Sequence, residues 1–182
     1  MKLAYLLLII ATCAVAKSSH AQVVFGTSHA VMNVNINYAD SVLKLQTSDL
    51  KVSLNYQTAE FIMHLNGSDL YHLDTISQMD ISVLDDIEFT FKGNFDLDYI
   101  KSTNHPPFSF EVQGELQYGD NDLQLIGKGD LTHISDGAYP SRLTMAFKIV
   151  PEDLEQLSMK PANFEYIILD IEQTVLEDDY NR

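Results

Sequence analysis

The sequence predicts an all-β domain: a closed or nearly closed antiparallel barrel with one short helix, or alternatively a two-sheet β-sandwich. Three observations predict it. Apolar and polar residues alternate in segment after segment, turn residues separate these segments, and glycines interrupt two of the longer ones. A period of two places the apolar side chains on one face of a strand. Several such strands joined by hairpins, without βαβ alternation, are typical of barrels and sandwiches.

The first 21 residues have the features of a secretion signal. Met1-Lys2 is a short basic start, and residues 3–16 form an uncharged apolar run. Cleavage is expected after Ala21, or alternatively after Ala16. The run is shorter than the roughly 20 residues of a membrane span. We therefore expect an exported protein, periplasmic or extracellular, without a transmembrane segment in its mature chain.

Composition limits the classes of function. The only cysteine, Cys13, lies in the signal, where lipid modification is a minor alternative, so the mature chain has no disulfide and no thiolate. The whole chain carries a formal charge of −15. Removal of the signal also removes Lys2 and Lys17, so the mature chain has nine basic and 26 acidic residues and a formal charge of −17. Nucleic-acid binding needs a basic patch, which this chain lacks. We expect one domain over 22–176 and a solvated acidic tail over 177–182.

The expected strands follow one another between polar turns. In chain order the strand-like segments are 23–25, 30–38, 43–45, 50–56, 61–65, 87–99, 108–118, 123–134, 143–149 and 166–175; we expect these ten segments to form about nine strands. The expected turns are Ala39-Asp40, Ser48-Asp49, Asn66-Gly67, Gly119-Asp120-Asn121-Asp122 and Asp136-Gly137.

Four places interrupt this pattern. Residues 68–85 have no clean period, which predicts a long connection with a short helical turn, acting as a lid or a rim. Gly93 lies in the longest alternating run and is expected to mark a bend or bulge. Gly127 and Gly129 are expected where a strand bends or the backbone is closely approached. Residues 151–157 start with Pro and carry early acidic residues, which predicts the helix.

Residues 86–176 carry a family resemblance. The segments that carry it are Phe89-Thr90-Phe91-Lys92-Gly93-Asn94-Phe95, His105-Pro106-Pro107 before 108–114, Gly127-Lys128-Gly129-Asp130-Leu131-Thr132-His133-Ile134, the Pro151 helix, and Gln173-Thr174-Val175-Leu176. Together they resemble the YceI-like family of exported polyisoprenoid-binding proteins, although that family's early Phe-rich strand and His-Leu pair are not found. The resemblance implies an eight-stranded lipocalin-like barrel, an apolar tunnel for a long isoprenoid chain, and no catalytic residues.

A hydrocarbon tunnel needs aromatic and adaptable apolar walls, and Met fits irregular gaps. The inward residues expected to bind the ligand are Tyr38, Met63, Phe89, Phe91, Phe110, Val112, Met145 and Phe147. The acidic chain favours a neutral head, such as a quinone or an alcohol, over a diphosphate. The alternative is a structural or interaction protein of the cell envelope, in which these residues form a filled core.

No pattern of catalytic or metal-binding residues was found. His29, His64, His72, His105 and His133 are scattered and form no zinc-type spacing. His133 shares a strand with Leu131 and is expected to be a hydrogen-bonded histidine or a single inward polar group. Ser109 and Ser141 lack a nucleophile-elbow context. We therefore expect no enzyme activity, no cofactor and no metal, and the sequence leaves the oligomeric state open.

Overall fold

The computed structural model describes residues 23–73, 80–101, 106–134, 141–153 and 164–177. They form nine strands and two short 3-10 turns. The strands are β1 Val24–Tyr38, β2 Val42–Asn55, β3 Glu60–Asn66, β4 Tyr71–His72, β5 Glu88–Phe95, β6 Phe108–Tyr118, β7 Asn121–His133, β8 Ser141–Ile149 and β9 Phe164–Leu176; the 3-10 turns are η1 Gly67–Asp69 and η2 Ser82–Leu84. The predicted signal and the turn at Asp136-Gly137 lie outside the described residues.

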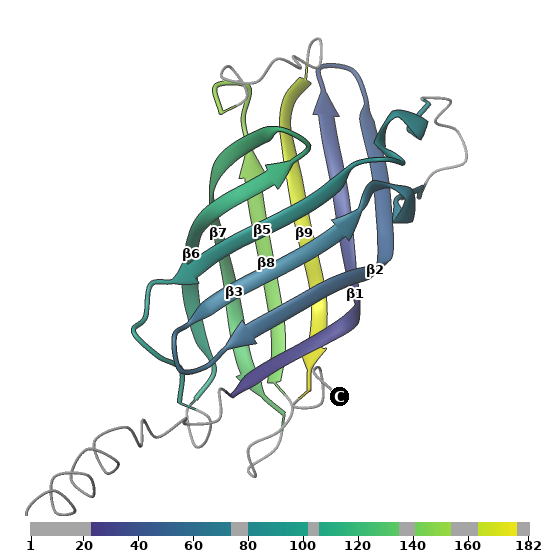
Figure 1. The fold of residues 1–182 in the computed structure, drawn as a ribbon. Coiled ribbons are helices and arrows are strands. Elements are labelled where there is room, and N and C mark those ends of the chain that lie inside the picture. The colour runs from purple at the N-terminus through teal and green to yellow at the C-terminus, as the bar shows by residue number, and fades with distance from the viewer. Residues whose placement is uncertain (1–22, 74–79, 102–105, 135–140, 154–163, 178–182) are drawn as a thin grey trace, which may run out of the picture.

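Eight of the strands close into an antiparallel barrel. The strand order is β1-β9-β8-β7-β6-β5-β3-β2, and β1 also pairs with β2, which closes the ring. The short strand β4 adds to the edge of β2 through Leu45↔His72 and Gln46↔Tyr71. Figure 1 shows β3 and β5 crossing in front of β8 and β9, so that opposite walls enclose one interior. The barrel prediction is confirmed, and the sandwich alternative is wrong.

The apolar residues of the alternating pattern form the interior of the barrel. On β8, Leu143, Met145, Phe147 and Ile149 are at most 5% exposed, while the residues between them face outward or are half-buried. The other strands repeat this pattern, because successive side chains point to opposite faces of a sheet. Closing the sheet brings all the apolar faces together in one core. Burial of apolar surface is the main favourable contribution to folding.

Two predicted turns differ from the structure. Ser48 and Asp49 lie inside β2, where the register with β1 shifts between Ala30↔Leu50 and Met32↔Thr47. They form an irregularity within a long strand, because β1 and β2 stay paired on both sides of them. Asn66-Gly67 is not a two-residue hairpin turn either. Asn66 ends β3 and Gly67 begins η1, and the chain reaches β5, the hydrogen-bonded neighbour of β3, only at Glu88.

Two further predictions concern the helix at residues 151–157 and the bend or bulge at Gly93. Pro151–Asp153 form a turn, and 154–157 lie outside the described residues. The 3-10 turns η1 and η2 are the only helical elements in the part of the chain that is described. At Gly93 the register with β3 and β6 is continuous, so no bulge occurs; Gly93 pairs with Gly114. Glu177, the first residue of the expected tail, is exposed and exchanges two backbone hydrogen bonds with Gly26; the rest of the tail lies outside the described residues.

The glycines of β7 allow aromatic rings to approach the backbone closely. A close approach was one of the two alternatives expected at Gly127 and Gly129, the other being a bend in the strand. A Cβ at Gly127 would collide with the ring of Phe147 on β8, and one at Gly129 would meet the ring of Phe110 on β6 and the backbone of β8. These rings therefore occupy the volume that side chains would fill on an ordinary strand. The arrangement fixes where the Phe147 ring lies, which matters for the site described below.

Replacing Gly127 should therefore destabilise the fold. We expect Gly127→Ala to lower the free energy of unfolding by about 1–3 kcal/mol, because the new methyl group overpacks the space held by the Phe147 ring. Urea denaturation would measure the change. Lys128→Ala, at the exposed neighbouring position, is the control and should change stability by less than about 0.5 kcal/mol. Equal stability of Gly127→Ala and wild type would contradict this packing.

Candidate ligand-binding site

One end of the barrel holds an apolar cavity of about 210 Å³ that is partly open to the outside. All the side chains that line it are hydrophobic: Met32, Val34, Ile36, Leu45, Leu50, Met63, Leu65, Leu70, Leu84, Phe89, Leu116, Ile149, Ile167 and Leu169. A buried water needs two to four polar partners, which this lining does not offer. The cavity therefore suits an apolar guest.

The course of the strands explains where the cavity lies. β2 pairs with β3 only from Lys51↔His64 to Asn55↔Glu60. The next inward residues beyond this pairing, Leu50 and Leu65, both line the cavity. The upper part of β2 pairs with β4 instead of β3, so β2 and β3 separate at this end of the barrel. The widened interior is the space that the cavity occupies.

The described parts of the connection between β3 and β5, residues 67–73 and 80–87, supply a cap over this end. Leu70 follows η1 and Leu84 ends η2, and both side chains line the cavity. The cap is fastened by a 2.8 Å hydrogen bond from the Gly67 amide to the Ile87 carbonyl. Gly67 is also packed against the backbone of Leu84, where a Cβ would collide with the carbonyl oxygen. These contacts are in keeping with the lid or rim expected at residues 68–85.

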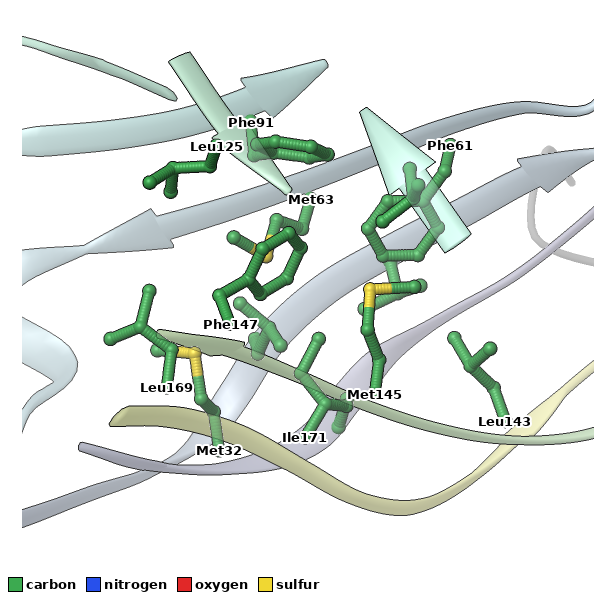
Figure 2. Close-up of a cluster of buried hydrophobic side chains, with 14 of the residues drawn as sticks. Met32, Phe61, Met63, Phe91, Leu125, Leu143, Met145, Phe147, Leu169 and Ile171 are labelled. Atoms are coloured by element: carbon green, nitrogen blue, oxygen red, sulfur yellow. The ribbon is translucent and has the colours of Figure 1, made fainter. Parts of the chain in front are cut away.

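Below the cavity, the interior is filled by the protein's own side chains. On six strands, the inward residue one step deeper than the cavity wall is at most 1% exposed and does not line the cavity. We call these residues the floor layer: Ala30, Val52, Phe61, Phe91, Phe147 and Ile171. The rings of Phe91 and Phe147 are 4.9 Å apart at its centre. Figure 2 shows the Phe147 ring directed toward Met63 and Phe91, with Met32 beside Leu169.

The structure places the eight sequence-predicted ligand residues at four kinds of position. Met63 and Phe89 line the cavity. Phe91 and Phe147 belong to the floor layer, and three more residues are buried deeper in the packed interior: Phe110, Val112 and Met145. Tyr38, at the end of β1, is half-buried and packs against the core cluster without lining the cavity.

Twelve cavity residues were not in the predicted set. Ten of them lie on strands, and their inward direction follows from the same alternation that selected Met63 and Phe89. Alternation identifies the inward face but not the depth along the barrel, so it does not separate cavity wall from packed core. Leu70 and Leu84 lie in the aperiodic connection. No period marks them, and only the packing of the cap brings them to the cavity.

A partly buried polar network occupies the opposite end of the barrel. Tyr56 Oη lies 2.5 Å from Ser141 Oγ, which lies 3.1 Å from His133 Nδ1, and His133 Nε2 lies 3.4 Å from the Lys101 carbonyl oxygen. His133 is therefore a hydrogen-bonded histidine, which is the first of the two alternatives expected for it. Tyr56 is 2% exposed and Ser141 1%. Burial raises the pKa of Tyr56 to about 12, partly offset by its hydrogen bond to Ser141.

Neither a metal site nor a membrane-spanning helix finds support in the described residues. No group of three or more His, Cys, Asp or Glu side chains is placed to hold a metal ion within the ranges that the structure describes. Among those same ranges, no helix is long and apolar enough to cross a membrane. The cavity wall carries no acid, base or nucleophile. What this geometry can do chemically is enclose an apolar group.

Comparison with known proteins agrees with the fold. A polyisoprenoid binding domain from Saccharophagus degradans, implicated in plant cell wall breakdown, has a similar structure with a TM-score of 0.59. The alignment covers 85% of this chain and 97% of that one, at 10% sequence identity. No family model matches the sequence, and no curated protein does. At this identity the likeness establishes a shared barrel fold.

Proposed function

We propose that this protein is an exported, non-enzymatic binding protein of the YceI-like type that holds an apolar, isoprenoid-type ligand in its barrel. The observation that carries the proposal is the wholly hydrophobic cavity beneath the cap. A structural protein with a filled core would have no use for such a space, since an unfilled cavity costs stability. The barrel shared with a polyisoprenoid binding domain supports the ligand class, and residues 1–21 support export to the periplasm or beyond.

The energetics permit this role. A cavity of about 210 Å³ exceeds the roughly 150 Å³ that holds benzene in an engineered apolar site. Burying about ten carbons at roughly 0.8 kcal/mol each gives about 8 kcal/mol. Association removes at least about 4 kcal/mol of it. The cavity alone then supports an affinity near millimolar, and contacts of the rest of the ligand at the mouth would add to it.

Native mass spectrometry of protein isolated from its own host tests the proposal. We expect a bound hydrocarbon that organic extraction releases. Val34→Phe, which inserts a larger side chain from β1 into the cavity, should lose this ligand while keeping the melting temperature of ligand-free wild type. Ile126→Phe places the same ring at a position on β7 that is 54% exposed and should retain the ligand. Equal ligand retention by Val34→Phe and wild type would exclude the cavity as the binding site.

The charges at the cap favour a neutral ligand head. Exposed Asp85 and Asp86 follow Leu84 directly, exposed Glu88 begins β5, and half-buried Asp69 precedes Leu70. We expect an isoprenoid alcohol to bind roughly tenfold more tightly than its diphosphate, since three or four carboxylates contribute a few tenths of a kcal/mol each. Isothermal titration at low and high salt would measure both, and the difference should shrink as salt screens the charges. Tighter binding of the diphosphate would contradict the proposed head.

A further inference from the structure

We infer that this chain selects a short apolar group, roughly eight to ten carbons or about two isoprene units, and that the Phe147 ring sets this length. The inference rests on the proposed function and concerns how deep a ligand can enter. The volume supports it: the cavity measures about 210 Å³, against the 150 Å³ or so that holds a six-carbon ring. Ligand sites for larger molecules usually measure about 300 Å³ or more.

The floor layer is what ends the cavity. Each of its side chains lies directly beneath a cavity residue on the same strand, for example Phe91 beneath Phe89 and Phe147 beneath Ile149. All six are at most 1% exposed, so no channel leads past them. A chain entering beneath the cap therefore meets packed side chains after one layer. Any further part of a long chain would have to remain outside the cavity.

Within the floor layer, Phe147 is the side chain best placed to control depth. It pairs with Leu169, a cavity residue, on one side and with Gly127 on the other. Because Gly127 has no side chain, the ring of Phe147 occupies the adjoining space and approaches the ring of Phe91 to 4.9 Å. Phe147 thus closes the centre of the barrel from β8. Shortening it would join the cavity to the space that the ring now fills.

The experiment compares geraniol, farnesol and geranylgeraniol, which differ by one isoprene unit each, by quantitative native mass spectrometry. A fully buried additional unit would raise affinity at least about tenfold. In wild type, the affinity for farnesol should exceed the affinity for geraniol by less than this tenfold factor. In Phe147→Ala, the ratio of the affinities for farnesol and geraniol should be about tenfold higher than in wild type. Phe147→Leu should raise this ratio as well, and it can be used if Phe147→Ala does not fold.

Phe95→Ala is the matched control. Phe95 is also a buried phenylalanine, 4% exposed, but it lies deeper in the interior, stacked on Phe110 at 3.8 Å, and does not border the cavity. Loss of the Phe95 ring should leave the affinity ratios among the three alcohols unchanged. A steady tenfold rise in affinity with chain length in wild type, or a farnesol-to-geraniol affinity ratio that is unchanged in both Phe147 variants, would overturn the inference. Failure of wild type to bind any of the three alcohols would instead count against the proposed function itself.

Discussion

Replacing Phe91 by Ala should lower the free energy of unfolding by about 3–5 kcal/mol. Phe91 is fully buried and lies between Phe61 and Phe147, with ring centroids at 6.1 and 4.9 Å. Truncating such a ring removes its transfer free energy and leaves a cavity that closely packed neighbours cannot fill. Domains of this size are stable by only about 5–15 kcal/mol, so the variant would be close to unfolding at moderate temperature.

Phe89→Ala is the matched control for this change. Phe89 lies two residues earlier on β5, lines the cavity and stacks on Tyr118 at 6.1 Å. One side of its ring already faces empty space, so fewer contacts are lost and the cost should be clearly smaller, about 1–2 kcal/mol. Guanidinium denaturation of both variants would give the two values. Equal losses would mean that the cavity wall and the floor layer do not differ in packing.

Raising the pH from 10 to 12 should remove up to about 3 kcal/mol of stability through Tyr56 alone. Its pKa is about 12 in the folded protein, because burial opposes the phenolate, and 10 when unfolded. A raised pKa means that the contribution is fully present below pH 10. It is lost as the pH rises toward 12, because the unfolded chain releases the proton first. Two pKa units correspond to roughly 2.7 kcal/mol.

Tyr56→Phe isolates this contribution. The variant cannot ionise at position 56, so the difference in unfolding free energy between wild type and variant should depend on pH only above about 10. Burial also raises the pKa of Tyr118, so the variant keeps a smaller alkaline loss of its own. Urea unfolding at pH 8, 10 and 11 would measure the difference. A difference that stays constant with pH would show that Tyr56 is not held neutral by burial.

Much of the fold was predictable because its information is local. Alternation along 143–149 or 108–118 depends only on the direction of successive side chains, and it identified the inward residues of these strands. Local signals failed to predict the structure where the pairing of a strand with its neighbour determines it. Ser48-Asp49 has turn composition, yet β1 holds it within a strand. Asn66-Gly67 has hairpin composition, yet the strand that pairs with β3 begins only at Glu88.

The cavity depends on distances that no local pattern contains. From the amino-acid pattern one can predict an acidic all-β chain with aromatic strands, an apolar inner face, and candidates such as Met63 and Phe89 on it. The three-dimensional packing is needed to find that β1 closes on β2, that β2 and β3 separate at one end, and that Leu70 and Leu84 cap the space there. The reason is that alternation specifies which way a side chain points. The volume left between opposite walls depends on how all the strands pack together.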